Sequence, residues 1–345
     1  MKTIEINTST GLSRIAIGET LRNLSVYVPQ GRAVIITDTT VAGLYGEQFP
    51  ELPTIVIGTG ERVKQLETLE TIYRAFIDHE VDRDTFVIGI GGGVVCDVAG
   101  FAASTFMRGV PFGFVATTLL AQVDASVGGK NGVNFAGFKN MIGVFKQPVF
   151  VLCDPSVLRT LSRPDIANGT AELVKHALIA DSEAFEFIET HAADILGLKA
   201  GIIEKAIDDA VRIKAAVVRE DELEKGERRK LNFGHTLGHA VESMTALPHG
   251  EAVSIGMAAA VSVSIARGVL KEQEAKRIIT LLERLGLPTK MPARPADLVE
   301  MLRRDKKRSG RSIHFILLKA IGEAIVEKMP LAEIERRCLK NPDML

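Results

Sequence analysis

The chain has 345 residues, of which 46% are hydrophobic and 25% are charged, and its formal net charge is −1. This length exceeds the roughly 250–300 residues that one hydrophobic core usually serves, so we expect two domains. The near-neutral charge excludes a general attraction to nucleic acid or to an anionic membrane. Three single cysteines, Cys96, Cys153 and Cys338, argue for a reducing compartment and against a disulfide scaffold.

The sequence predicts neither a signal peptide nor a membrane span. Its first ten residues alternate like an edge strand and lack the apolar stretch of a signal peptide. The longest uncharged apolar run, 252–266, is shorter than the roughly 18–20 residues that span a bilayer, so we expect a buried core helix there. We therefore expect a cytoplasmic protein without membrane or nucleic-acid partners.

Strand-like runs alternate with amphipathic stretches in the first half of the chain. The runs at 33–38, 53–60, 85–93 and 112–118 each end in polar or glycine residues, and 62–80 carries apolar residues at helical spacing. This alternation predicts an α/β fold with a parallel sheet and crossover helices.

The second half follows a different pattern. After one more strand-like run at 149–155, the chain is helix-like from about Arg163 to Leu285, rich in Ala, Leu, Glu and Lys. A late β-type run at 312–318 interrupts this half, and a helix-like segment at 331–341 follows.

The change of pattern places a domain boundary near residues 154–163. We expect an α/β domain at 1–158 and a mainly α-helical domain at 159–345. No repeat, low-complexity segment or long linker is visible in either part of the sequence.

A glycine-rich loop, GIGGGVVCDVAGF at 89–101, follows a predicted strand and opens a helix. Glycines let a backbone approach a phosphate, and a helix N-terminus supplies oriented N–H groups. The dinucleotide fingerprint fails because Val94 replaces its third glycine and its downstream acid is missing, although Asp38 ends an earlier strand. We predict a nucleotide site of another lineage, while tight packing would explain the glycines nearly as often.

Cations set among glycines occupy the segment 117–143, where we expect Lys130 and Lys139 in loops near Asp124 and Asn140. Such cations grip small phosphorylated or carboxylated ligands, although a single lysine is more often a solvated surface residue. Further basic candidates are Arg108, Lys175, Lys214, Arg228 and the run at 305–307. The basic cluster at 303–308 lacks interleaved aromatic residues, which disfavours a nucleic-acid patch.

Four residues of the helical half are metal-ligand types: Glu172, His235, His239 and His249. His235 and His239 are four residues apart, so they project from one side of a helix. A carboxylate with imidazoles from separate segments, and an open coordination position, is typical of catalytic Zn²⁺. A lone histidine is usually a satisfied surface or core residue, but four such residues together favour a metal site.

Seven segments together resemble 3-dehydroquinate synthase, in the same order and over nearly the whole chain. They are GGGVVCDVAGF, TTLLAQVDASVGGK, KNMIGVF, AELVKH, GERRKLNFGHTLGHAVE, LPHGEAVSIGM and DKKRSG. The resemblance runs from about Asp38 to beyond Leu318 and implies that the first domain binds NAD⁺ and the second binds metal and substrate.

The resemblance implies NAD⁺ and Zn²⁺ or Co²⁺ as cofactors, with Glu172, His235 and His249 as metal ligands and His239 as a non-ligand active-site residue. The implied NAD⁺ contacts are Asp38, Glu61, Lys64, Gly92, Gly93, Asp97, Thr117, Thr118, Lys130, Lys139 and Thr160. The implied catalytic and substrate contacts are Arg108, Asp124, Lys130, Asn140, Lys175, Lys214, Arg228, Asn232, His239 and Lys306, with Lys307 as an alternative to Lys306. Two departures from the family are Asn131, in place of a common threonine, and Cys96, which we expect to be open to oxidation or alkylation.

The family converts 3-deoxy-D-arabino-heptulosonate 7-phosphate into 3-dehydroquinate and phosphate, in the shikimate pathway of aromatic amino acid biosynthesis. The resemblance implies transient oxidation by NAD⁺, phosphate elimination, reduction and intramolecular aldol closure, with the leaving phosphate as base. It also suggests a homodimer. We expect the phosphate to meet Lys130, Asn140 and His239, with Arg108 reaching over from a partner subunit. We expect the carboxylate and ring hydroxyls to meet Lys214, Arg228 and Lys306.

Three alternatives stay open from the sequence. A related sugar-phosphate cyclase acting on sedoheptulose 7-phosphate would share the fold, NAD⁺ and metal. A metal-dependent alcohol or glycerol dehydrogenase would release NADH and would not need so many phosphate-binding cations. A non-catalytic NAD-sensing protein would have lost a ligand or a lysine, and none is missing.

Overall fold

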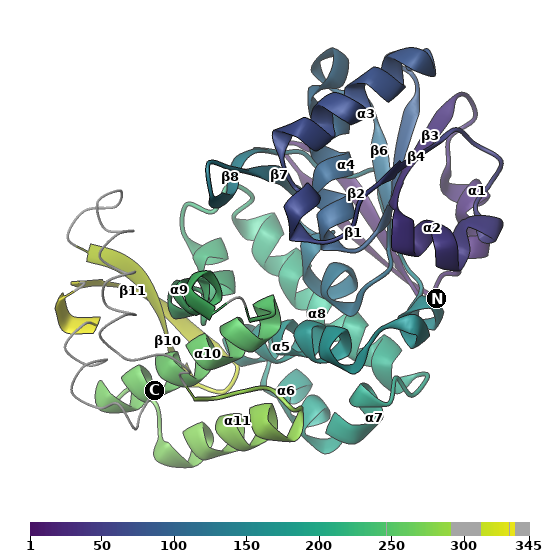
Figure 1. Ribbon diagram of the computed structural model, residues 1–345. Helices are drawn as coiled ribbons and strands as arrows, with labels where there is room; N and C mark the ends of the chain where they lie inside the picture. The colour runs from purple at the N-terminus through teal and green to yellow at the C-terminus, as the bar shows by residue number, and fades with distance from the viewer. Residues whose placement is uncertain (246, 291–311, 331, 335–345) are drawn as a thin grey trace. The chain divides into compact units, whose positions relative to one another are not determined.

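The computed structural model describes residues 1–245, 247–290, 312–330 and 332–334 (Figure 1). The chain divides into two compact units, Met1–Leu161 and Ser162–Leu345. The first unit contains the parallel sheet and the second is mainly helical, so the predicted fold class is confirmed.

The first unit is built on a seven-stranded sheet in the order β1-β2-β9-β6-β5-β3-β4. The edge strand β1 pairs antiparallel with β2, and the other neighbours are parallel. Every residue of β5, β6 and β9 is buried, as expected for strands covered on both faces. The bounds are β1 Lys2–Thr8, β2 Gly11–Ile17, β3 Ala33–Asp38, β4 Thr54–Ile57, β5 Phe86–Gly91, β6 Phe112–Ala116 and β9 Phe150–Cys153.

The helices of the first unit connect these strands, so the predicted alternation is confirmed. The amphipathic stretch at 62–80 contains α3, which buries Leu69, Ile72 and Phe76. The α-helices are α1 Leu24–Tyr27, α2 Thr39–Tyr45, α3 Leu66–Asp78 and α4 Gly93–Thr105. Short helical turns are η1 Leu21–Asn23, η2 Gly46–Gln48, η3 Glu61–Val63, η4 Phe106–Arg108, η5 Ala121–Ala125 and η6 Pro155–Thr160.

Two further strands of this unit, β7 Lys130–Phe135 and β8 Phe138–Phe145, form an antiparallel hairpin, and β7 packs against α4. The prediction that Lys130 and Lys139 lie in loops is therefore wrong. Gly132 and Gly143 face each other across the hairpin, and a Cβ on either would meet a backbone oxygen of the other strand at 2.6 or 2.5 Å. These glycines permit a close approach of two strands, and in the sequence they conceal the strand pattern.

The second unit is a group of packed helices, as predicted. Their bounds are α5 Arg163–Ala180, α6 Ser182–Thr190, α7 Ala192–Leu196, α8 Ile202–Glu220, η7 Glu227–Asn232, α9 His235–Thr245, α10 His249–Ala266 and α11 Glu272–Arg284. By length and composition α10 could cross a membrane, but 72% of it is buried inside the protein. It packs against α5, α9, α11 and β10, so the predicted buried core helix is confirmed.

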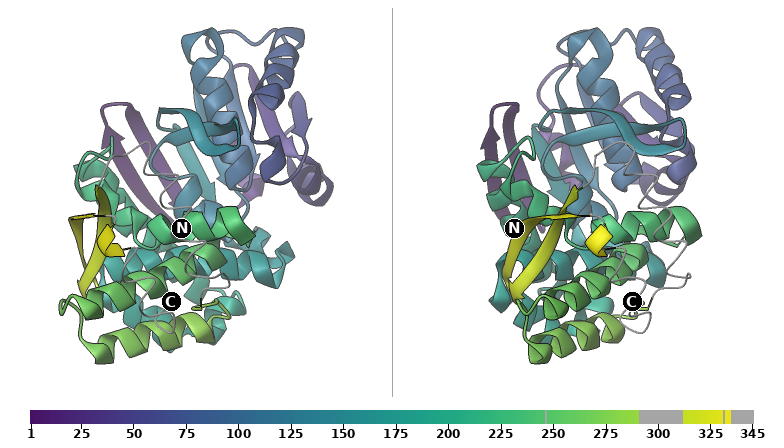
Figure 2. Two further views of the ribbon diagram at one scale, coloured as in Figure 1. Left: turned by 60° about the vertical axis from the view of Figure 1, so that its left-hand side comes forward. Right: turned by 90° about the vertical axis from the view of Figure 1, so that its left-hand side faces the viewer.

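A two-stranded antiparallel hairpin, β10 Ser312–Ala320 and β11 Glu323–Pro330, completes the described part of this unit and lies beside α10 (Figure 2). The strand expected at 312–318 is confirmed, whereas β11 was not predicted. Its charged residues Glu323, Glu327 and Lys328 obscure the strand pattern. The helix predicted at 331–341 falls largely outside the described residues.

Candidate active site

Three of the four predicted ligand types converge in the second unit. Glu172 lies on α5, while His235 and His249 are the first residues of α9 and α10. The Nε2 atom of His235 lies 3.7 Å, and that of His249 3.6 Å, from the same Oε1 atom of Glu172. One ligand atom from each residue can be chosen so that all lie within 4.8 Å of one another. A carboxylate and two imidazoles with this convergence fit a three-ligand catalytic metal site.

The protonation of the two histidines also fits a metal site. Burial, followed by the charge of Lys175, lowers the pKa of His235 to about 3, so its ring is neutral and able to bind a metal. Burial would also lower the pKa of His249, but the carboxylates of Glu172 and Glu242 outweigh it and raise that pKa to about 9. A cation bound here would therefore replace the proton of His249.

Glycines bring the two histidine-bearing helices together. A Cβ on Gly256 of α10 would lie 1.9 Å from the carbonyl oxygen of Gly234, and one on Gly238 of α9 would lie 3.0 Å from that of Ala252. Gly234, with φ of +80°, also turns the chain into α9. The glycines of the GHTLGH and HGEAVSIG segments therefore let α9 pack closely against the N-terminal half of α10, and the ring centroids of His235 and His249 lie 5.3 Å apart.

A second close contact joins α10 to α5. The backbone N–H of Gly250 donates to Oδ1 of Asn168, and a Cβ on Gly250 would lie 2.3 Å from the Asn168 carbonyl oxygen. Asn168 precedes Glu172 by four residues on α5, so both lie on one face of that helix. This contact holds the start of α10, and with it His249, against α5 one helical turn from Glu172.

His239 stands beside this group but is exposed. Its ring centroid lies 5.2 Å from that of His235 and 6.3 Å from that of His249. It also forms a second possible ligand group with Glu242 and His249. The structure thus brings all four predicted residues together, and the choice of ligands among them stays a prediction.

Three of the predicted substrate-binding cations are buried in the second unit: Lys175, Lys214 and Arg228. The ammonium of Lys175 pairs with Oε2 of Glu172, and the guanidinium of Arg228 donates to the carbonyl of Glu222. They lie on α5, α8 and η7, which pack against one another. Cations are almost never fully buried unless they are paired, so the packing of these elements depends on partners for the three cations.

The loop before η7 is ordered by Asp221, whose carboxylate accepts backbone N–H groups of Lys225, Gly226 and Arg228 at 2.9, 2.6 and 3.1 Å. Burial works against them, but these hydrogen bonds lower the pKa of Asp221. At the end of η7 the amide of Asn232 donates to Glu224.

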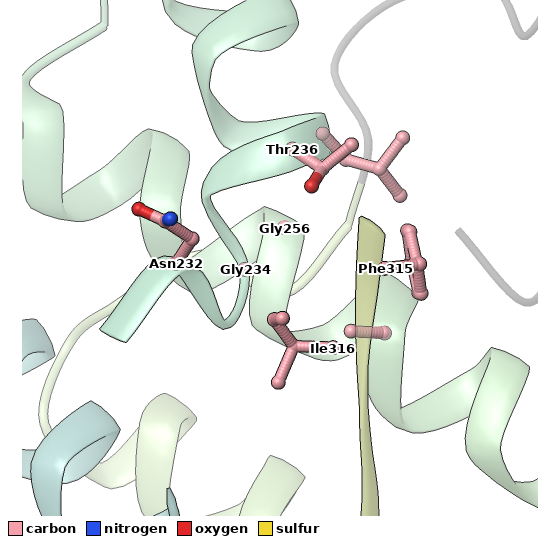
Figure 3. A pocket seen from close by; sticks show the side chains of 8 residues that line it. Asn232, Gly234, Thr236, Gly256, Phe315 and Ile316 are labelled. Carbon is pink, nitrogen blue, oxygen red and sulfur yellow. The ribbon is translucent and has the colours of Figure 1, made fainter. Parts of the chain in front are cut away.

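A small pocket lies next to Asn232, lined by residues of η7, α9, α10 and β10. Figure 3 shows the Asn232 amide directed away from Thr236 and Phe315, which lie on the other side of this pocket. Gly234, Gly256 and Ile316 complete the lining that is labelled there. The pocket is a small gap where helices pack against a strand, and the Asn232 amide donates to Glu224 instead of facing this gap.

In the first unit the predicted NAD⁺ contacts follow the carboxyl ends of five neighbouring parallel strands. Ligands of open parallel sheets bind at this edge. Asp38 ends β3, and the other candidates follow β4 (Glu61, Lys64), β5 (Gly92, Gly93, Asp97), β6 (Thr117, Thr118) and β9 (Thr160). Residues far apart in the sequence are thus assembled on one edge of one sheet.

Several of these residues also stabilise the fold. Oδ1 of Asp38 caps α2 by accepting the backbone N–H groups of Thr40 and Val41 at 2.8 and 2.9 Å. Lys64 is buried and pairs with Asp97. The hydroxyl of Thr160 lies 2.7 Å from that of Tyr45.

The glycine loop is tightly packed. A Cβ on Gly92 would lie 3.0 Å from the methyl group of Thr118, and one on Gly93 would lie 3.0 Å from Ala125. Both glycines adjoin the N-terminus of α4, with Gly92 as its cap residue. The packing and the phosphate-binding interpretations of these glycines are therefore compatible.

The hairpin residues Lys130, Lys139 and Asn140 are all exposed. The backbone N–H of Asn140 donates to Oδ1 of Asn134 at 2.8 Å, and the amide of Asn134 donates to Glu61 at 2.7 Å. The hairpin is thereby tied to the cofactor edge of the sheet.

The remaining predicted site residues do not belong to this hairpin, although Arg108 lines one cavity with Val144 and Phe145 of β8. Asp124 lies in η5, half-buried. Arg108 ends η4, exposed with φ of +69°, and the cavity that it lines has a volume of about 420 Å³. Lys306 and Lys307 lie outside the described residues.

One expectation is overturned by burial. Cys96 is buried in α4, and desolvation raises the pKa of its thiol well above the usual value. A neutral, inaccessible thiol is not a target for oxidation or alkylation, so that prediction is wrong. Asn131, the other departure from the family, is buried, and its amide donates to the carbonyls of Gly129 and Lys146 at 3.0 and 2.9 Å.

Two residues near the carboxylate–imidazole cluster were not predicted from the sequence. Asn168 anchors α10, and Glu242 lies 3.6 Å from His249. A signal for Glu242 exists in the sequence, because it follows His235 by seven residues and so shares its face of α9. No comparable sequence signal marks Asn168.

Comparison with known proteins identifies the family. The family model described as 3-dehydroquinate synthase N-terminal matches residues 54–168, and the one described as 3-dehydroquinate synthase C-terminal matches 169–308. The 3-dehydroquinate synthase of Halorhodospira halophila is 44% identical over 311 residues, which is 88% of each chain.

Two solved structures share the whole fold. The 2-epi-5-epi-valiolone synthase of Streptomyces hygroscopicus, with NAD⁺ and Zn²⁺ bound, has a TM-score of 0.87 and 30% identity, covering 99% of this chain and 98% of its own. A 2-deoxy-scyllo-inosose synthase complexed with carbaglucose-6-phosphate, NAD⁺ and Co²⁺ also has a TM-score of 0.87, with 27% identity and coverage of 98% and 100%.

The fold is shared with cyclases that bind NAD⁺ and Zn²⁺ or Co²⁺, and the homologues place the chain in a carbocycle-forming, phosphate-eliminating class of enzymes. Within that class, the chain belongs to the 3-dehydroquinate synthase family. The predicted family, enzyme class and function are therefore confirmed.

Proposed function

We propose that this chain converts 3-deoxy-D-arabino-heptulosonate 7-phosphate into 3-dehydroquinate and phosphate, using NAD⁺ and either Zn²⁺ or Co²⁺. Family membership supports the reaction. The observation that carries it is the convergence of two histidine Nε2 atoms on one oxygen of a buried glutamate. The cofactors bound by the two related cyclases support the cofactor assignment.

The metal would be held by Glu172, His235 and His249. It would polarise neighbouring substrate hydroxyls and lower their pKa. The chain prepares this site by keeping His235 neutral, by burying Glu172 completely, and by setting Lys175 against the second oxygen of that carboxylate.

NAD⁺ would be held along the carboxyl edge of the sheet in the first unit, where it would accept a hydride and return it within one turnover. Gly92 and Gly93 leave room for a phosphate beside the N-terminus of α4. Asp38 has a second carboxylate oxygen to offer a ribose. The other proposed contacts are Glu61, Lys64, Asp97, Thr117, Thr118, Lys130, Lys139 and Thr160.

The substrate carries a phosphate and a carboxylate, and the proposed contacts are mostly cations and amides. Lys130, Asn140 and His239 would bind the phosphate, Arg108 would reach over from a partner subunit, and Asp124 would be a further substrate contact. Lys214, Arg228, Asn232 and Lys306 would hold the carboxylate and ring hydroxyls, and Lys175 would add positive charge beside the metal. The departing phosphate would take the proton, so the reaction would not need a carboxylate base.

The direct test is phosphate release from 3-deoxy-D-arabino-heptulosonate 7-phosphate, with trace NAD⁺ and added Zn²⁺, while absorbance reports NADH. We expect phosphate release without lasting NADH, because the cofactor is regenerated in each turnover. Activity on sedoheptulose 7-phosphate alone would instead assign the chain to a related cyclase. Accumulation of NADH on simple alcohols would make it a dehydrogenase and contradict the proposal.

We also propose that the chain works as a cytoplasmic homodimer, in which Arg108 serves the site of its partner. Several large apolar side chains of the hairpin are exposed, among them Phe135, Phe138 and Met141, as expected of a surface that another protein covers. The positive φ of Arg108 fits a side chain held in a special direction.

Mixing two inactive variants tests this arrangement. Arg108→Ala and His235→Ala would each lose activity, and a mixed dimer would regain one intact site if Arg108 acts across the interface. Light scattering should give twice the chain mass of 37.3 kDa. A monomeric mass, or no recovery from a demonstrated mixed dimer, would contradict the proposal.

A further inference from the structure

Glu242 is a carboxylate beside the metal cluster to which no role has been assigned. It lies on α9, three residues after His239 and seven after His235, so it shares their face of the helix. Its Oε2 atom lies 3.6 Å from Nδ1 of His249, and its side chain is only 10% exposed. A carboxylate is thus held at the outer side of one of the converging imidazoles.

The two nitrogens of His249 face two different carboxylates. Nε2 lies 3.6 Å from Oε1 of Glu172, on α5, and Nδ1 lies 3.6 Å from Oε2 of Glu242, on α9. The ring is therefore oriented from both ends by elements other than its own helix.

His235 has the same arrangement with a different outer partner. Its Nε2 lies 3.7 Å from Oε1 of Glu172, and its Nδ1 lies 3.2 Å from the carbonyl oxygen of Phe233. Both histidines thus direct Nε2 toward Glu172 and place Nδ1 beside an oxygen acceptor. A single pattern in two imidazoles from different helices indicates a common requirement on their orientation.

We propose that Glu242 is a positioning residue that accepts the Nδ1–H of His249 and so leaves Nε2 to bind the metal. This inference rests on the proposed metal site. A ligating imidazole usually donates its other N–H to an acceptor, which fixes the tautomer and the ring orientation and makes the ligand more basic.

His249 needs such support more than His235 does. Its side chain is 28% exposed, whereas that of His235 is 11% exposed and packs within the protein. His249 begins α10 directly after Pro248, which offers no capping side chain, and the Asn168 contact holds the backbone of Gly250 rather than the imidazole ring. A charged acceptor in place of a neutral carbonyl therefore compensates for a less confined ring.

The test measures metal affinity directly in the full-length chain, after the metal is stripped with a chelator. Zn²⁺ and Co²⁺ would be titrated against a competing indicator for the natural chain and for Glu242→Ala, Glu242→Gln and His249→Ala. Glu204→Gln is the matched control, because it removes one exposed glutamate charge from α8 of the same unit.

We expect Glu242→Ala to lower the affinity for Zn²⁺ and for Co²⁺ by about 10- to 100-fold, which is the usual cost when a ligating histidine loses its outer hydrogen-bond partner. Glu242→Gln should lose less affinity, because its amide oxygen still accepts the N–H. Both variants should bind one metal per chain, with unchanged melting temperature when metal-free. Glu204→Gln should bind like the natural chain.

Three outcomes would overturn the inference. Unchanged affinity in Glu242→Ala would show that the carboxylate does not act on His249. Loss as complete as in His249→Ala, in both Glu242 variants, would make Glu242 a ligand in the group with His239. A fall in melting temperature of the metal-free chain that accounts for the loss would make its role structural. If the natural chain itself binds no metal stoichiometrically, the proposed metal site fails, which is a distinguishable result.

Discussion

In the first unit the candidate residues lie where strands end, and several of them already hold the fold together, whereas in the second unit they are charged side chains buried between helices. Asp38 both caps α2 and stands at the proposed ribose position. Glu172 is wholly buried among cations and imidazoles. The proposed cofactor-binding edge thus consists of residues that also cap helices and pair within the fold, while the proposed metal site consists of buried charges that balance one another.

The strongest test of this comparison is Glu172→Gln. The variant loses one of three proposed ligands and leaves the ammonium of Lys175 facing a neutral amide. We expect metal affinity to fall by more than about 100-fold, beyond the usual cost of losing an outer partner. Stability should fall by about 3 kcal/mol, because one partner of a buried ion pair is removed. Metal analysis and urea unfolding measure the two effects separately.

A variant that kept its metal and its stability would show that Glu172 is neither a ligand nor the counter-charge of Lys175. The exposed Glu204→Gln serves again as the control for loss of a single charge.

A glycine substitution in each unit sharpens the comparison at the level of packing. Gly256→Ala would place a methyl group 1.9 Å from the carbonyl oxygen of Gly234, so α9 and α10 must separate. We expect a loss of about 3 kcal/mol, at the high end for overpacking, together with weaker metal binding. Gly43, inside α2, has no atom within 4 Å of its missing Cβ. Gly43→Ala should therefore gain about 0.5–1 kcal/mol from helix propensity.

Equal stability of these two alanine variants in thermal unfolding would mean that α9 and α10 can move apart without a loss of folding stability. The glycines of the ligand segments would then have no positioning role.

The double role of Asp38 can be separated with two variants. Asp38→Ala should cost about 1 kcal/mol of stability, because α2 loses its N-cap. Asp38→Ser retains a capping oxygen and should stay near the natural stability. If the carboxylate binds the ribose, both variants should lower the affinity for NAD⁺ by about 10- to 100-fold, because hydrogen bonds to charged groups contribute about 1.5–3 kcal/mol. Unfolding and NAD⁺ titration measure the two roles separately. Full NAD⁺ affinity in Asp38→Ser would show that Asp38 caps α2 and does not bind the ribose.

The smallest expected effect concerns acid stability. The folded-state pKa of Asp221 is lowered by backbone hydrogen bonds, so its contribution is complete above its ordinary pKa of 3.8 and is lost as pH falls through the lowered value. Asp221→Asn should therefore destabilise the chain slightly at pH 7 and flatten its loss of stability below pH 4. Unfolding curves across this range test the prediction, and parallel curves for the two chains would contradict it.

The regular elements were predictable from the sequence because their residues are locally consistent. The β-branched runs of β3 and β5 and the helical spacing of α3 predict those elements without tertiary information. The β7–β8 hairpin was not predictable in this way. Its paired Gly132 and Gly143 resemble loop residues until the opposite strand explains why no side chain fits.

The residue types of the candidate site were predictable from the sequence, but the residues that hold the candidate ligands in place were not. The residue types of Glu172, His235, His239 and His249 indicate a metal site, and the family resemblance reduces this set to three ligands with His239 as a non-ligand. The contacts of Asn168 with Gly250 and of Glu242 with His249 join different helices. Nothing local in the sequence encodes such pairings, because they arise only when α5, α9 and α10 pack.

The Asn168–Gly250 contact has a consequence for how the protein acquires its metal. It ties the start of α10 to α5 through a backbone hydrogen bond, one helical turn from Glu172, without using any proposed ligand. We therefore expect the metal-free chain to keep the start of α10 against α5, so that an added ion meets ligands that already lie near one another.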